Sequence, residues 1–235
     1  MIKISKDKQV YFDPIEHKYT NTKGERLISV SQLLHKFVNE FDPTGEITRN
    51  YAKKHNMTVE EVIEKWRIIN EESCTYGTAV HEELEHYVLT GEVRESPYVW
   101  AVEEFKKIIF KGKLHCEVLV HNIDEMVAGQ VDLIEQLPDG YINIWDYKTN
   151  KELKKRNLYG QMMLDCLWRH EDCNYNHYQL QLSLYAYLCE LKGLKINKLT
   201  ILYINPKSKL IEQHEVKYLR KDIINILKKK KDFIY

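Results

Sequence analysis

The spacing of apolar residues changes along the chain and predicts helices followed by strands. Apolar side chains recur at helical spacing over residues 75–89 and again over 98–110. The apolar stripe expected on the second helix comprises Val99, Val102, Phe105, Ile108 and Ile109. Segments rich in β-forming residues then follow at 114–120, 126–137 and 141–148. A Pro-Asp-Gly turn at 138–140 separates the last two, so we expect three antiparallel strands.

The flanking segments complete an α/β pattern. Residues 1–45 predict a small hairpin and a helix near 31–37, and residues 44–70 are polar and helical. After the three strands, the sequence predicts a helix over 178–191, strands over 199–205 and 210–216, and a final lysine-rich helix. This order fits helices packed on a mixed sheet. We expect one domain, with an N-terminal elaboration (1–74), a core (75–216) and a basic C-terminal helix (217–235).

Composition narrows the class of protein. The 235 residues are 43% hydrophobic, and 35 Lys and Arg balance 35 Asp and Glu, so binding of a nucleic acid would have to use local patches. The five cysteines show no CxxC pair, which argues against a disulfide framework or structural zinc site. The sequence contains neither an apolar leader nor a run of about 18 apolar residues. We expect a cytoplasmic protein that is not secreted and does not contact membranes.

The strand over residues 141–148 carries the strongest chemical signal. Side chains two apart share a face, so Ile142 and Ile144 lie on the same side as Asp146 and Lys148. A carboxylate and an ammonium at the end of a buried apolar ridge are costly unless each has a partner or a role. An ion pair at a strand end that reaches solvent also explains this pattern.

A second acid favours a metal site. Asp132 lies in an apolar strand that we expect to pair, through the Pro-Asp-Gly turn, with the strand carrying Asp146. Mg²⁺ is usually held by one or two carboxylates together with water and substrate phosphate. The Tyr147 carbonyl could supply a third oxygen, and Gly129 would permit close approach of a backbone or phosphate. The two strands therefore predict a site for Mg²⁺ or Mn²⁺.

A histidine on the preceding helix could join this site. Gly77, His81 and Glu85 are spaced by four and fall along one helix face. A lone histidine on a helix is usually a surface or satisfied core residue, so His81 gains significance only from the neighbouring acids.

Taken together, these motifs resemble the RecB-like branch of the PD-(D/E)XK nucleases. The motifs of that branch occur here in its order, as Gly77/His81/Glu85, Gly129/Asp132, Asp146/Lys148 and Gln181/Tyr185. The resemblance covers about residues 75–205. The chain is also similar to phage-encoded and mitochondrial genome-maintenance exonucleases. The resemblance implies a restriction-endonuclease-like fold, with a central mixed β-sheet flanked by helices.

The resemblance also implies roles for these residues. His81, Asp132 and Asp146 would bind metal, and Lys148 would orient or activate the attacking water. Gln181 and Tyr185 would support the site or the DNA strand. Some relatives hold an iron–sulfur cluster through one cysteine before the nuclease core and three near the C-terminus. The last cysteine here is Cys189, inside the helix of the last motif, so we expect no such cluster.

Further candidates rest on weaker patterns. Glu85 and Glu117 could serve a second metal or position water, although Glu117 also fits a solvent-facing strand residue. Lys228 and Lys229 belong to a basic cluster that could bind DNA, or could be an ordinary solvated helix face. Tyrosines near a cleft could stack on unpaired bases.

We expect a Mg²⁺-dependent DNA exonuclease that acts on single-stranded ends. It would serve phage or bacterial DNA replication, recombination or repair. Other replication or recombination proteins are candidate partners. Open alternatives are a structure-specific endonuclease and a non-catalytic DNA-binding subunit. A zinc protein using His81, His115, His121 or His170 lacks ligand spacing. The oligomeric state is not predicted.

Overall fold

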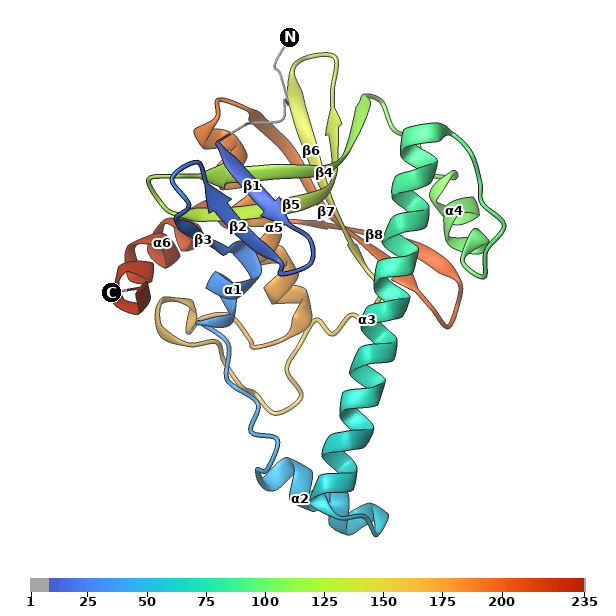
Figure 1. Cartoon of the computed structure of the whole chain (residues 1–235), viewed down its shortest axis with the longest axis vertical. Helices are drawn as coiled ribbons and strands as arrows, with labels where there is room; N and C mark the ends of the chain where they lie inside the picture. Colours follow the sequence, from blue (N-terminus) through green and yellow to red (C-terminus); the bar gives the residue numbers. More distant parts are fainter. Residues whose placement is uncertain (1–8, 235) are drawn as a thin grey trace.

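The computed structural model describes residues 9–234 and shows a mixed sheet flanked by helices (Figure 1). Within these residues the sheet has eight strands: β1 (Val10–Asp13), β2 (Lys18–Asn21), β3 (Arg26–Ser29), β4 (Lys113–Asn122), β5 (Val127–Gln136), β6 (Tyr141–Lys148), β7 (Lys195–Asn205) and β8 (Leu210–Val216). The helices are α1 (Val30–His35), α2 (Glu46–His55), α3 (Val59–Thr90), α4 (Val99–Phe105), α5 (Asn174–Leu191) and α6 (Arg220–Ile234), with a 3₁₀ turn at Asp165–Leu167.

Both strand orientations occur in the sheet. β3 runs parallel to β5 and β6 runs parallel to β7, whereas β4, β5 and β6 form the expected antiparallel meander. The parallel β6–β7 pair is joined through α5, because parallel neighbours need a crossover connection. The expected α/β fold with a central mixed sheet and flanking helices is confirmed.

The two faces of β6 belong to different parts of the core. Ile142 and Ile144 are fully buried beside α5, whereas Trp145 and Tyr147 pack with side chains of α3 and α4. This alternation confirms the face predicted for Ile142 and Ile144 and places Asp146 in register with them. β6 is therefore buried on both sides almost to its end.

Helix α3 is longer than the sequence suggested. It begins at a capping box, in which the Thr58 side chain accepts from Glu61 N, and it ends at Gly91 in the left-handed conformation. The boundary expected between residues 74 and 75 lies inside this helix. Its C-terminal half packs against the sheet, and its N-terminal half extends away from it towards α2 (Figure 1).

Helix α4 is shorter than expected. It ends at Phe105, and the next residues form turns. Val102 and Phe105 are buried as predicted, but Val99 is 39% exposed and Ile109 is 87% exposed. The expected apolar stripe was therefore wrong at both ends, because the chain turns away before Ile109 can reach the core.

Candidate functional site

The pairing of β5 with its neighbours determines where Asp132 lies. On one side, β5 pairs with β3 at Val127 and Ala128, and its pairing with β6 begins at Leu133. Asp132 lies in the interval between these two pairings. There its carboxylate Oδ2 accepts a hydrogen bond of 2.6 Å from the Tyr147 backbone amide. The separation of the strands thus allows the Asp132 carboxylate to reach the backbone at the end of β6.

The end of β6 brings a second acid together with a lysine. Lys148 Nζ lies 2.6 Å from Asp146 Oδ2, and these side chains are only 16% and 2% exposed. The Lys148 ammonium also lies 4.8 Å from the ring centroid of Tyr178 on α5. This cation–π contact was not anticipated from the sequence, although Tyr178 begins the helix predicted there.

Glu117 of β4 lies opposite Asp132. The flanking pairs are Cys116 with Leu133 and Val118 with Val131, so the register brings the two acids together. Glu117 has a φ of 49°, a left-handed conformation that is uncommon for a non-glycine residue inside a strand. Such a conformation redirects the side chain and is often found at functional sites.

Helix α3 supplies the histidine. His81 Nδ1 lies 3.6 Å from Asp132 Oδ1, which is too long for a hydrogen bond. One ligand atom from each of His81, Glu117 and Asp132 lies within 4.8 Å of the others. The close approach of α3 depends on Gly77, where a Cβ atom would lie 3.0 Å from Thr149 Oγ1.

Burial raises the pKa values of three acids in this region, and neighbouring carboxylates add to the effect at Glu117 and Asp146. Burial raises the pKa of Glu117 from 4.5 to about 8, and Asp132, Glu85 and Asp146 add to the effect. Burial also raises the pKa of Asp146 from 3.8 to about 6, although Lys148 opposes it. The pKa of Asp132 is raised by burial despite the nearby Lys148. These carboxylates lack enough positive charge, so a bound cation would stabilise them.

The pKa values of the two basic groups, His81 and Lys148, shift in opposite directions. Burial and the nearby Lys148 lower the pKa of His81 from 6.5 to about 4, so the imidazole is neutral at pH 7 and able to bind a metal. Burial lowers the pKa of Lys148, but Asp146 and Asp132 more than offset it and leave the pKa above 10.5. Lys148 is therefore a cation at neutral pH. We call His81, Glu117, Asp132, Asp146 and Lys148 the acidic centre.

The acidic centre opens into a cleft of about 820 Å³ between α3 and the end of β6. Its lining includes Trp66, Gly77, His81, Lys148 and Tyr178. His81 and Lys148 therefore connect the acidic centre to this cleft.

A protein-family comparison decides the class of this centre. The family model of the PD-(D/E)XK nuclease superfamily matches residues 21–231. The chain belongs to the PD-(D/E)XK nuclease superfamily. Members of this superfamily use divalent metal ions and act on nucleic acids, and the acidic centre of this nuclease fits such an ion because it gathers a neutral imidazole with carboxylates.

Other comparisons add little detail. The structure of the protein SSO0001 has a TM-score of 0.43 and 16% identity, over 88% of this chain and 76% of the other. A provisionally designated exonuclease from Eubacterium rectale has a TM-score of 0.38 and 14% identity, over 87% and 71% of the two chains. No curated protein matches the sequence.

The remaining motif of the nuclease packs behind the centre. Gln181 Nε2 donates a 3.0 Å hydrogen bond to the Tyr185 hydroxyl, and Tyr185 is only 4% exposed. A Cβ atom at Gly129 would lie 2.6 Å from Tyr185 Cε1 and 2.9 Å from Val30 Cγ2. Gly129 of β5 therefore makes room for the buried Tyr185 ring. From the sequence, we had expected it to allow close approach of a backbone or phosphate.

The outlying candidates have different surroundings. Glu85 of α3 is close enough to raise the pKa of Glu117, which places it at the edge of the centre. Helix α6, with Lys228 and Lys229, packs on α5 and the 3₁₀ turn, and lies across the molecule from α3 (Figure 1). Lys229 Nζ lies 3.4 Å from both Asp165 and Asp232. Its charge is thus already partly balanced.

None of the helices in the described part of the chain has the length and apolar character that crossing a bilayer requires.

Proposed function

We propose that this nuclease is a metal-dependent deoxyribonuclease of the RecB-like branch, which hydrolyses phosphodiester bonds from single-stranded ends. The observation that carries the proposal is the meeting of His81, Glu117 and Asp132 beside the Asp146–Lys148 ion pair. The order of the sequence motifs supports the branch. The same resemblance supports a role in phage or bacterial DNA replication, recombination or repair, alongside proteins of those processes.

In this proposal, His81, Glu117 and Asp132 hold Mg²⁺ or Mn²⁺, with Asp146 and the Tyr147 carbonyl as further oxygen donors. A bound divalent ion would polarise the scissile phosphate and lower the pKa of a coordinated water. An imidazole ligand is less typical of Mg²⁺ than of softer ions, so we expect Mn²⁺ to support activity at lower concentration. Gln181 and Tyr185 support the site from behind.

Lys148 would stabilise negative charge as the phosphate is attacked. Its pKa lies above the usual value, so it is already protonated near pH 7 and cannot act as a general base. Its ammonium is fixed between Asp146 and the Tyr178 ring before substrate binds. Preorganised charge of this kind needs little rearrangement during the reaction, which is the main source of its catalytic effect.

End-labelled linear DNA, single-stranded and double-stranded, tests the proposal when it is incubated with Mg²⁺, Mn²⁺ or EDTA. We expect metal-dependent loss of the single-stranded substrate, which Asp146→Ala abolishes. A covalently closed single-stranded circle should remain intact, and its cleavage would establish an endonuclease instead. Absence of cleavage under every condition would contradict the catalytic role and favour a DNA-binding subunit.

A further inference from the structure

The cleft continues beyond the acidic centre. Asn150 and Lys151 line both this cleft and a second hollow of about 540 Å³. The second hollow is lined by Lys154 and Arg156 from the loop that follows β6. A substrate leaving the centre past Lys148 would therefore meet this loop next.

The loop presents positive charge that is not neutralised by neighbours. We call residues 151–156 the basic segment; its charged members are Lys151, Glu152, Lys154, Lys155 and Arg156, and all are exposed. Within residues 9–234, no acidic side chain forms an ion pair with Lys151, Lys154 or Arg156. By contrast, Lys229 of α6 lies beside two acids. Uncompensated lysine and arginine side chains beside a nuclease site are suited to phosphate.

On the α3 side of the cleft, Trp66 packs against Phe41, which precedes α2 and lines a neighbouring hollow. The rings of Phe41 and Trp66 lie 5.6 Å apart, and Phe41 is 55% exposed. We call these two residues the aromatic pair. Trp66 lines the same cleft as Lys151 and His81, and Ile69, which is 37% exposed, lies between Trp66 and His81 on α3. Trp66 lies about 22 Å from His81 along the helix, at about 1.5 Å per residue.

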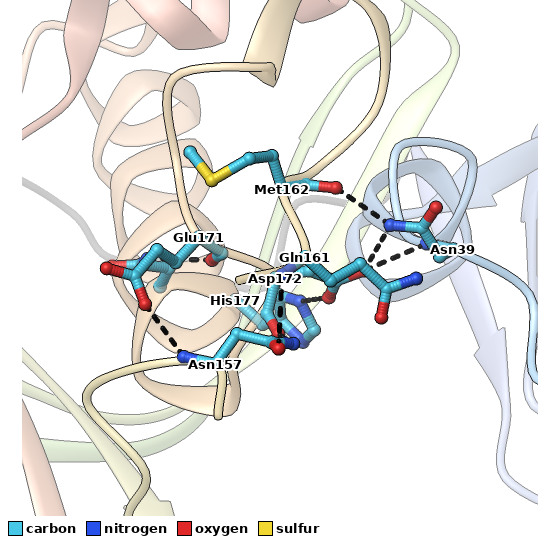
Figure 2. A network of polar contacts seen from close by, with 8 residues as sticks. Asn39, Asn157, Gln161, Met162, Glu171, Asp172 and His177 are labelled. Atoms are coloured by element: carbon cyan, nitrogen blue, oxygen red, sulfur yellow. Dashed lines mark hydrogen bonds and ion pairs between the residues drawn. The ribbon is translucent and has the colours of Figure 1, made fainter. Parts of the chain in front are cut away.

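A network of hydrogen bonds joins Asn39, which shortly precedes Phe41, to Asn157 at the end of the basic segment (Figure 2). Asp172 Oδ2 accepts from the Asn39 backbone and side-chain amides, at 3.0 and 2.7 Å. The Asn157 side chain donates to the Asp172 carbonyl at 2.6 Å, and its backbone amide donates to Glu171 Oε2 at 2.8 Å. Asn39 is close to Phe41 in sequence, and Asn157 directly follows the basic segment. The network therefore anchors the basic segment and the chain next to Phe41 to one framework.

We propose that the basic segment and the aromatic pair form a binding track for an unpaired nucleic acid strand that leads to the acidic centre. Lys151, Lys154 and Arg156 bind its phosphates, and Phe41 and Trp66 stack on its bases. A duplex hides its base faces in the helical stack, so only an unpaired strand satisfies both surfaces at once. The direction of the track towards a cutting site rests on the proposed function, whereas the binding itself does not.

The test measures binding without cleavage. Fluorescent oligo(dT), the matching RNA strand and a blunt DNA duplex are titrated with the protein in EDTA at several salt concentrations. Trp66→Ala should weaken strand binding about 5- to 100-fold through loss of stacking. Trp66→Phe keeps an aromatic face and should restore most of the affinity, which a purely structural loss at this position would not predict.

Loss of one phosphate contact has a different signature. Lys154→Ala and Arg156→Ala should each reduce the slope of log affinity against log salt by about 0.7. Lys195→Ala is the matched control: Lys195 is exposed and lies at the other end of the β6–β7 pair, opposite Tyr141. This variant should bind like the wild type, with an unchanged slope.

The outcomes separate the two proposals. Preferential binding of DNA or RNA single strands with these losses supports the track, even where the wild type cuts nothing in Mn²⁺ and the proposed function fails. Equal binding by the wild type, Trp66→Ala and the Lys154→Ala/Arg156→Ala double variant overturns the track, even where metal-dependent cleavage is present. Duplex binding as tight as strand binding overturns it too.

Discussion

Two acid–histidine pairs in this protein have opposite surroundings. In the network of Figure 2, Asp172 Oδ1 lies 2.7 Å from His177 Nε2, and its Oδ2 accepts two hydrogen bonds from Asn39. In the acidic centre, Asp132 Oδ1 is 3.6 Å from His81 Nδ1, and a second carboxylate, Glu117, lies beside them. The first pair is satisfied within the protein, whereas the second is not.

The difference shows which pair serves the fold. A buried carboxylate that receives several hydrogen bonds needs no external ligand, because its lost hydration has been replaced. Carboxylates that raise one another's pKa values are held together at a cost to the folded state. Residue types alone do not distinguish these cases, but the partners of each oxygen do.

The largest expected effect is on turnover, from Lys148→Ala. Loss of this fixed cation should lower the cleavage rate by at least about 10³-fold, equivalent to about 4 kcal/mol of transition-state stabilisation. Cleavage of end-labelled strands measures the rate, and calorimetric titration should show that Mn²⁺ still binds. Lys195→Ala provides the control cation. A Lys148→Ala rate above a tenth of the wild-type rate would refute the assigned role.

A second substitution should affect stability and not metal binding. Asp172→Ala removes the acceptor for Asn39 and His177 and leaves these partly buried groups without it. We expect a loss of about 2–4 kcal/mol in unfolding free energy, a fall in Tm of about 4–16 °C. Thermal unfolding in EDTA measures it. Asp132→Asn is the matched variant, because it removes a charge from the crowded centre and should not lower Tm. Equal destabilisation by both would erase the distinction between the pairs.

Much of the fold was accessible from sequence because it rests on local periodicity. The meander and the face shared by Ile142 and Ile144 followed from alternation and a Pro-Asp-Gly turn. The continuity of α3 was missed because Glu71 and Glu72 interrupt its apolar pattern, while its backbone hydrogen bonds continue. Ile109 was misplaced because nothing in its spacing marks the end of α4 after Phe105.

The site was accessible only in part, for a similar reason. Asp146 and Lys148 stand out because charge interrupts a buried strand. From the sequence, Glu117 was only a candidate for a second metal or a solvent-facing strand residue. Its left-handed backbone conformation and its position opposite Asp132 arise only when the strands assemble. The Asn39–Asp172 network was not foreseen, since the two residues are far apart in the chain and their types are common on surfaces.

A substitution that neutralises one acid of the acidic centre should raise the stability of the metal-free protein, in contrast to Asp172→Ala. Glu117→Gln removes one of the crowded charges, so the metal-free protein should gain about 1 kcal/mol, or about 2–4 °C in Tm, at pH 8. The same variant should lose most of the Tm increase that Mn²⁺ gives the wild type. Asp172→Asn is the control, because that acid is satisfied by hydrogen bonds and its neutralisation should bring no gain. A destabilised metal-free Glu117→Gln protein would contradict the assignment.

The smallest expected effect is the dependence of metal-free stability on pH. The pKa of Glu117 is raised from 4.5 to about 8, so its folded form holds a proton that the unfolded chain releases, and its contribution is lost as pH rises between these values. His81 acts in the opposite sense, but only between pH 6.5 and about 4, and Asp146 acts only up to about pH 6. Because the pKa of Asp132 is also raised, the contribution of Glu117 between pH 6.5 and 8 is isolated by comparison with Glu117→Gln.

Over that interval, Tm in EDTA should fall by about 1–2 °C more in the wild type than in Glu117→Gln, a modest change because Glu117 is partly exposed to solvent. The stabilisation by Mn²⁺ should grow over the same interval, since the ion competes with a proton for Glu117. Parallel curves for the two proteins would show that Glu117 does not titrate there. The charge of Glu117 would then have to be stabilised by groups of the protein itself, as the charge of Asp172 is. In that case the acidic centre would not differ from the Asp172–His177 pair in its need for a bound cation.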